Sequence, residues 1–196
     1  MKKYIWILCP TIFLISLKLP AQRISQIVEY IKDTSAQNDT LISYQPDLKL
    51  TWKDFEGTTT DKSEVAALTM SGFGYKLKYS SLGNKVDLII SVFCNFVKKD
   101  SWVKPEKNTP YILNHEQHHF DIANIQARLF EKKLKALNLP GKGFAQIIEN
   151  TYREYKTAMG EMQDQYDAET KHSRIIEQQE LWDKKIDGLL EKVNGE

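Results

Sequence analysis

The chain has 196 residues, of which 41% are hydrophobic and 27% are charged, and this ordinary globular balance excludes a wholly disordered protein. Such a length suits one domain and leaves little room for a second. Lys and Arg number 27 against 26 Asp and Glu. The chain therefore lacks the basic excess of a nucleic-acid-binding protein, and no nucleic-acid partner is expected.

Residues 1–21 have the layout of a secretory signal peptide. A basic start, Met1 to Lys3, precedes an apolar run from Tyr4 to Leu17, and the small residue Ala21 marks the expected cleavage point. The alternative is a membrane anchor, but the run is short for a span of about 20 residues. We therefore expect an exported protein, periplasmic or secreted, with residues 22–196 as one domain and no membrane span after cleavage.

Only one cysteine, Cys94, follows the predicted cleavage point, so the mature protein has no internal disulfide and a packed core must hold the fold. Cys94 falls on the apolar phase of a predicted strand. It is expected to be a small buried hydrophobic residue rather than a nucleophile.

The first half of the chain predicts one short helix and a small sheet. Apolar residues at helical spacing predict a helix from Gln22 to Thr34. Alternation predicts a short strand from Asp47 to Trp52. Two longer period-two runs predict strands from Phe73 to Tyr79, starting as early as Ala66, and from Val86 to Phe96. The turn at Gly83-Asn84 joins these two into an antiparallel hairpin.

The second half predicts three longer helices. The first begins after Thr109-Pro110, an N-cap followed by proline at the first helical position, and runs to about Leu137. The second runs from about Gly143 to Asp167 or beyond, and the third from Ile175 to about Val193. The expected fold class is α+β, with a small antiparallel sheet packed against three helices.

The first long helix carries the motif His115-Glu116-Gln117-His118-His119, the HExxH pattern of zinc hydrolases. Residues four apart share one face of a helix, so His115 and His119 can bind one metal ion. Glu116 is placed to accept a proton from a metal-activated water molecule. His118 faces another side and is expected to support the site rather than to bind this ion. The alternative is an exposed helix turn that happens to be rich in histidine.

A catalytic zinc usually has three protein ligands and one open position. The third ligand must come from elsewhere, and His172 is the first candidate, followed by Asp167 and Glu169. The second long helix should return antiparallel to the first and bring its end close to His115. Tyr166 could donate a hydrogen bond to an oxyanion, although a core position is the simpler interpretation of its place in an apolar stripe.

Several blocks in order resemble a bacterial domain-of-unknown-function family described as predicted secreted zinc-dependent proteases. They are Leu50 to Gly57, Ser101 to Val103, Leu113 to Asp121, and Tyr166 to Ser173 with Gln179 and Trp182 behind. The resemblance covers roughly residues 45–190. It implies a zincin-like domain and an exported location, with the HExxH roles carried by His115, Glu116 and His119.

The expected function is a Zn²⁺-dependent metalloprotease that hydrolyses a peptide or protein substrate. Zinc would polarise the scissile carbonyl, and Glu116 would act as general base. The alternative is an exported protein that binds the metal at the same residues without proteolysis, either a degenerate zincin or an interaction module. A third possibility is a helical interaction domain without a metal.

Overall fold

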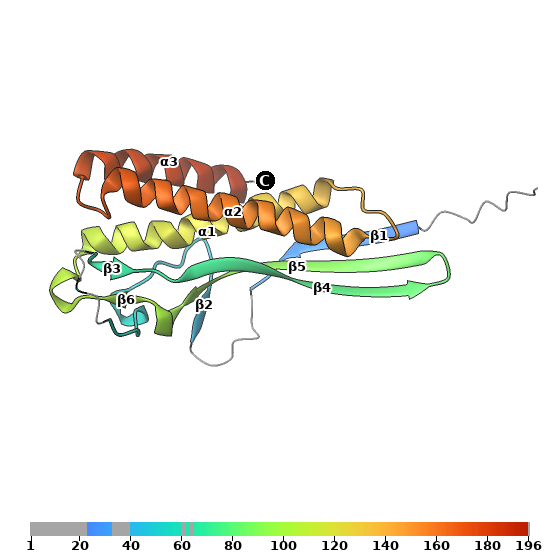
Figure 1. Ribbon diagram of the computed structural model, residues 1–196, viewed down its shortest axis with the longest axis horizontal. Helices are drawn as coiled ribbons and strands as arrows, with labels where there is room; N and C mark the ends of the chain where they lie inside the picture. The colour runs from blue at the N-terminus through green and yellow to red at the C-terminus, as the bar shows by residue number, and fades with distance from the viewer. Residues whose placement is uncertain (1–22, 33–39, 60–61, 63–64, 196) are drawn as a thin grey trace, which may run out of the picture.

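The computed structural model describes residues 23–32, 40–59, 62 and 65–195. The predicted signal peptide therefore lies outside the described residues. Three helices stack on one side of a sheet, and a long hairpin of the sheet extends along them (Figure 1). The strands are β1 (Arg23–Tyr30), β2 (Leu41–Ser43), β3 (Ala67–Leu68), β4 (Ser71–Leu82), β5 (Lys85–Val97) and β6 (Trp102–Val103). The helices are α1 (Pro110–Ala136), α2 (Phe144–Thr170) and α3 (Ile176–Asn194).

The predicted hairpin is confirmed, and it forms the centre of the larger sheet. Strands β4 and β5 pair antiparallel from Ser71↔Phe96 to Leu82↔Lys85, so Gly83 and Asn84 alone make the turn. Gly83 has a φ of 61°, a conformation that glycine adopts without steric cost. The inward residues of β5 are buried, including Cys94, which is a free thiol in the core as expected. Burial raises the pKa of the Cys94 thiol well above its ordinary value.

The predicted helix at residues 22–34 is wrong, because this segment forms β1. It pairs parallel with β5 in the register Ile24↔Val86 to Tyr30↔Val92, so the four-stranded sheet is mixed rather than antiparallel. Gln26 lies on the inward face, where the amide nitrogen donates to the carbonyls of Leu134 and Leu137 at the end of α1. A polar residue at an inward position, and an exposed Ile27 beside it, hid the period-two pattern.

The strand predicted from Asp47 to Trp52 is also absent. Residues 44–50 instead cross α1 without regular pairing, and a short 3₁₀ turn follows at Trp52–Asp54. The backbone N–H of Leu50 donates to the side-chain oxygen of Gln117 at 2.9 Å, and the Tyr44 hydroxyl donates to Asp121 at 2.9 Å. Buried polar groups of α1 thus take the place of a strand partner.

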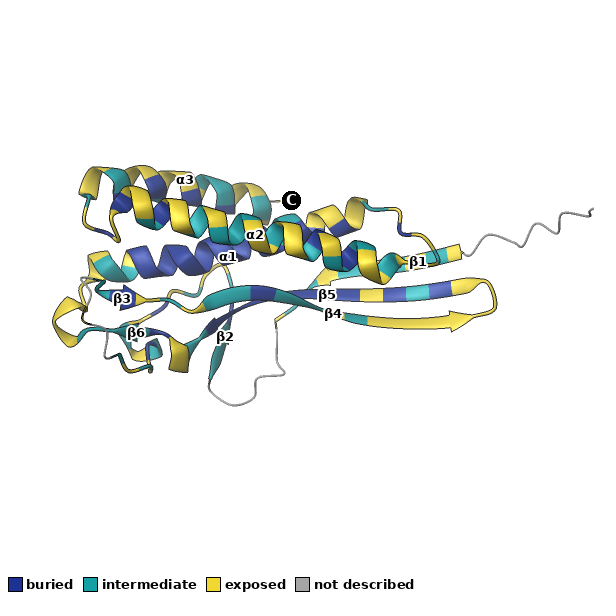
Figure 2. Cartoon of the chain, in the orientation of Figure 1, coloured by how far each residue is buried: buried dark blue, intermediate teal, exposed yellow. Residues whose placement is uncertain are grey.

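The three long helices are confirmed, with ends within a few residues of those predicted. The Thr109 side chain accepts the N–H of Ile112 and caps α1, as its position before Pro110 indicates. Helix α1 lies between the sheet and the other two helices, and its middle is dark blue in Figure 2. Residues 115–127 are all buried, and eight of them are polar or charged. Packing alone does not account for so many buried polar side chains, because each needs a partner.

Candidate metal centre

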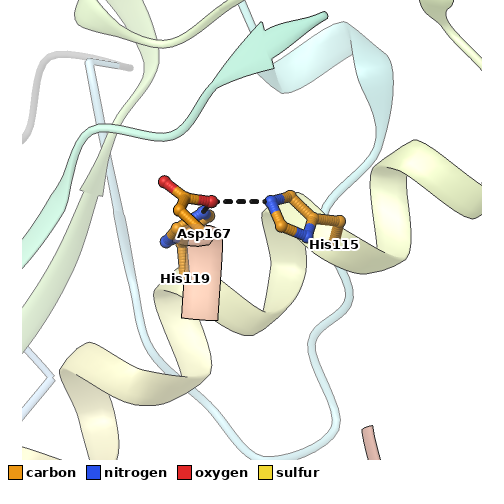
Figure 3. A group of neighbouring side chains, drawn as sticks. All are labelled: His115, His119 and Asp167. Carbon is orange, nitrogen blue, oxygen red and sulfur yellow. Dashed lines mark hydrogen bonds and ion pairs between the residues drawn. The ribbon is translucent and has the colours of Figure 1, made fainter. Parts of the chain in front are cut away.

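His115, His119 and Asp167 converge where α1 meets the C-terminal part of α2. The two histidines come from successive turns of α1, and Asp167 reaches them from the last turn of α2 (Figure 3). One carboxylate oxygen of Asp167, Oδ1, lies 3.0 Å from His115 Nε2 and 3.1 Å from His119 Nε2. The three ligand atoms all lie within 4.8 Å of one another, so a single metal ion could bind them.

The expected return of the second helix thus holds, and it brings Asp167 to both histidines. His172 lies one step further out, with Nδ1 3.3 Å from the same Asp167 oxygen and a side chain that is 43% exposed. Glu169 is turned away, since it accepts hydrogen bonds from Trp182 and Gln165. The sequence predicts His172 as the third ligand ahead of Asp167. Both residues lie near the C-terminal end of α2, so their positions along the chain do not show which side chain reaches the histidines.

The turn after α2 fixes the position of His172. Lys171, His172 and Ser173 all have positive φ, between 51° and 66°. Non-glycine residues rarely adopt this left-handed conformation, and never in runs without support from neighbouring groups. Here the backbone N–H of His172 donates to the carbonyl of Asp167, and that of Ile175 donates to Thr170. The strained turn therefore holds the imidazole of His172 beside the carboxylate.

Hydrogen bonds from α3 determine which nitrogen of His115 carries a proton. The side-chain amide of Gln179 donates to the Tyr166 hydroxyl at 2.5 Å and to Asp183 Oδ1 at 2.6 Å. A carboxylate can only accept, so this amide must be oriented with its NH₂ group toward Asp183. Its oxygen then faces His115 Nδ1 at 2.8 Å and must accept a proton from it. In the neutral ring, the lone pair of His115 Nε2 is then on the side of His119 and Asp167.

That arrangement matches the chemistry of a metal-binding histidine, in which one ring nitrogen donates to a fixed acceptor and the other binds the ion.

Tyr166 also helps to hold His115 in place, because its ring packs against the imidazole. Its ring is fully buried and stacks on His115, with centroids 4.5 Å apart and planes inclined by 24°. Burial raises the pKa of the Tyr166 phenol, and its hydroxyl accepts from Gln179. The phenol is thus a core group under the histidines, and it does not line the adjoining cavity.

Electrostatics within the cluster are dominated by Asp167. Burial alone would raise the pKa of its carboxyl, but hydrogen bonds and charge interactions with His115 and His119 hold that pKa well below its ordinary value. Burial alone would lower the pKa of His119. The hydrogen bond to Asp167 and the charges of Glu116 and Asp167 outweigh burial and raise it. The site therefore concentrates negative charge where a cation would lie.

A cavity of about 270 Å³ opens beside these three residues. Polar side chains line part of it. They are Glu116 and the two histidines of α1, with Gln163, His172 and Ser173. The cavity is also lined by residues 65–69, which include β3, and by Trp102 of β6. Glu116 is itself buried, and its backbone carbonyl accepts a hydrogen bond from Thr69. The expected base and the candidate ligands thus face one shared space.

The register of β3 leaves the backbone groups of Ala67, a residue that lines this cavity, without a hydrogen-bond partner in β6. Ala67 pairs with Val103 and Leu68 with Trp102, while Lys104 N–H donates to the Ala66 carbonyl. In an antiparallel ladder, hydrogen-bonded pairs alternate with pairs that make none. Ala66 and Leu68 therefore bond to β6, and the N–H and C=O of Ala67 point to the other edge. The sequence had not predicted β3 and β6 as a separate two-stranded sheet.

Residues 99–173 match the family model described as "Bacterial protein of unknown function (DUF922)". The matched segment begins just before Trp102 and ends at Ser173, so it contains β6, the HExxH motif, Asp167 and His172. The expected resemblance to a bacterial family of unknown function is confirmed over this segment, which is narrower than the 45–190 region suggested by the sequence blocks. No curated protein and no solved structure matches the chain.

No helix among the described residues is long and apolar enough to cross a membrane.

Proposed function

We propose that this protein is an exported zinc-dependent peptidase of zincin-like design, with His115, His119 and Asp167 as ligands and Glu116 as general base. The observation that carries the proposal is the orientation of His115, because its Nδ1 donates to the Gln179 oxygen and Nε2, which has a lone pair in the neutral ring, faces two further ligand atoms. Two imidazoles and one carboxylate form a ligand set typical of catalytic zinc, with one position open.

Zinc, when bound, would supply Lewis acidity that polarises a scissile carbonyl and lowers the pKa of a water molecule to about 7. Glu116 would accept a proton from that water and pass it to the leaving amine. His172 lies beside Asp167 and lines the cavity, where its imidazole could donate a hydrogen bond to the developing oxyanion. An extended peptide would lie along the free edge of β3, where Ala67 offers one donor and one acceptor.

The role of Glu116 is tested by Glu116→Gln. This variant should retain zinc, because Glu116 is not a ligand, and should lose hydrolysis of a mixed peptide library by a factor of at least about 10². Zinc content is measured by elemental analysis and cleavage by mass spectrometry. Glu177→Gln, which changes an exposed glutamate on α3, is the matched control. Equal cleavage by Glu116→Gln and wild type would refute the proposed base.

A zinc-loaded wild type that cleaves no peptide in the library would instead favour the non-proteolytic metal-binding protein. A wild type that binds no zinc would refute both the peptidase and the non-proteolytic metal-binding protein.

The choice of third ligand is tested by comparing Asp167→Ala with His172→Asn. Asparagine tolerates the left-handed conformation of position 172, so the second variant removes the imidazole without adding backbone strain. We expect loss of Asp167 to weaken zinc binding more than about 100-fold, and His172→Asn to weaken it by only about tenfold, the low end of the 10–100-fold that supporting partners usually contribute. Competition with a chromophoric chelator measures both. The reverse order would make His172 the ligand.

A further inference from the structure

A second group of ligand-type side chains lies on the other side of α1, between α1 and α3. It consists of His118 and Asp121 from α1 with Asp183 and Asp187 from α3, and we call it the α1–α3 cluster. Asp183 and Asp187 are four residues apart and share one face of α3. None of the four belongs to the proposed peptidase site, although Gln179 bonds to both His115 and Asp183.

The ring of His118 is oriented in the same way as that of His115. Its Nδ1 lies 3.0 Å from Asp183 Oδ1, and a carboxylate can only accept, so Nδ1 carries the proton. Asp183 is held in turn by Gln179 and by the Asn114 amide. The other ring nitrogen, Nε2, therefore faces away from Asp183 with its lone pair free in the neutral ring. It points toward Asp121 and Asp187.

Asp121 supplies an oxygen that the fold leaves unsatisfied. Its side chain is completely buried, and Oδ1 accepts hydrogen bonds from Tyr44 and Gln117. Oδ2 has no hydrogen-bond partner among the described residues. A buried carboxylate oxygen without a partner is costly, on the order of 1–3 kcal/mol or more. That oxygen lies 4.0 Å from His118 Nε2, which is too long for a hydrogen bond.

The third group around this gap is Asp187, whose Oδ1 lies 3.9 Å from His118 Nε2. Its side chain is 65% exposed, so it can turn toward the gap at little cost. Ligands bound to one ion at about 2.0–2.2 Å each lie roughly 3–4 Å apart, depending on the angle between them. Two carboxylate oxygens lie 4.0 Å and 3.9 Å from His118 Nε2, and the exposed Asp187 side chain would have to turn to bring its oxygen closer to that of Asp121. One nitrogen and two carboxylate oxygens would then form a ligand set for a divalent cation that accepts mixed nitrogen and oxygen donors.

We infer that His118, Asp121 and Asp187 form a second divalent-cation site, with Asp183 orienting the His118 ring. A bound cation would satisfy the buried oxygen of Asp121 and join α1 to α3 directly behind the histidines of the first site. The competing arrangement is an ion-paired His118 with no metal, in which the exposed Lys49, whose charge acts on Asp121, contributes to balancing that carboxylate.

The test is zinc stoichiometry on the full chain, with zinc alone as probe. Protein is saturated with zinc, passed through a desalting column and analysed for metal per chain. Wild type should hold two ions. Asp187→Asn should hold one and bind the second at least about tenfold more weakly in a chelator competition, because altering a ligand should cost at least as much as altering a supporting partner. Glu191→Gln, an exposed acid one turn further along α3, is the matched control and should hold two.

His119→Ala separates this site from the proposed peptidase site. It should hold one ion if both sites exist, and that ion should be lost in the double variant with Asp187→Asn. One ion in wild type and Asp187→Asn, but none in His119→Ala, would overturn the second site and leave the first intact. One ion in wild type and His119→Ala, but none in Asp187→Asn, would support the second site and refute the first. Two ions in Asp187→Asn would also overturn the second site.

Discussion

Both amide hydrogens of Gln179 are donated, to Tyr166 and Asp183, and this leaves its oxygen as the only acceptor available to His115 Nδ1. Removing that acceptor should free the ring to rotate or change tautomer. We expect Gln179→Met to lower zinc affinity about 10–100-fold, the usual cost of losing a partner that orients a metal ligand. Competition with a chelator, on protein shown to be folded by circular dichroism, measures the loss.

Two comparisons make the Gln179 prediction specific. Gln178→Met makes the same chemical change one residue earlier, outside this hydrogen-bond chain, and should leave zinc affinity unchanged. Gln179→Glu keeps an acceptor for the proton of His115 Nδ1 and should bind zinc more tightly than Gln179→Met. If Gln179→Met binds zinc like wild type, the orientation of His115 does not depend on this amide.

At the same scale, the sequence predicts the two histidines and the glutamate but not their support. Positions 115, 116 and 119 follow from the helical period, because spacing of one and four residues fixes directions on a helix. Gln179 and Asp183 have no such signal, since their contacts join residues more than 60 positions apart in sequence. The choice between Asp167 and His172 depends on the left-handed turn at residues 171–173. That turn contains no glycine or asparagine, so the sequence does not predict it.

At the scale of elements, a side chain in the middle of β1 binds the C-terminal end of α1. The Gln26 amide donates to Leu134 O at 3.2 Å and to Leu137 O at 2.8 Å, two carbonyls at the C-terminal end of α1, where the regular helical hydrogen bonds end. Gln26→Ala should therefore destabilise the protein by about 1–2 kcal/mol, the cost of two partly buried hydrogen bonds. In a chain of this size, that corresponds to a fall in Tm of roughly 2–8 °C, measured by thermal denaturation.

Ser25→Ala is the control for Gln26→Ala, because Ser25 is the neighbouring residue on the exposed face of β1. It should change Tm by less than about 2 °C, as surface substitutions usually stay within ±0.5 kcal/mol. Equal effects of the two variants would show that the end of α1 gains nothing from the Gln26 amide.

Element types were predictable where one physical cause dominated. In the β4–β5 hairpin, apolar residues recur at every second position along each strand. The N-cap of α1, Thr109, directly precedes the helical segment in the sequence. The errors fall where tertiary contacts decide. Strand β1 has its inward polar position satisfied by a distant helix end, and residues 44–50 have their backbone groups satisfied by side chains of α1. Parallel pairing of β1 with β5 also left no local turn signal, since the connection spans more than 50 residues.

At the scale of the whole molecule, the residues of the proposed metal site are held in place by the packed core and do not need the metal for their positions. His115 and His119 lie in the uninterrupted buried segment of α1, and Asp167 is held from α2, which packs on the same helix. Zinc removal should therefore leave the fold intact. A chelator such as EDTA should leave the far-ultraviolet circular dichroism spectrum unchanged, unlike a small zinc domain, which unfolds without its metal.

Zinc should nevertheless stabilise the folded chain, because it binds the assembled ligands and not the unfolded ones. One ion at a free concentration of 100 times its Kd contributes about 2.7 kcal/mol, which is a rise in Tm of roughly 5–11 °C for a chain of this size. The rise should shrink in Asp167→Ala and persist in Glu116→Gln, since only the first removes a proposed ligand. Scanning calorimetry of chelator-treated protein, with and without zinc, measures it. If zinc leaves the Tm of wild type unchanged, or raises it equally in Asp167→Ala, then His115, His119 and Asp167 are a polar core cluster and the metal centre is refuted.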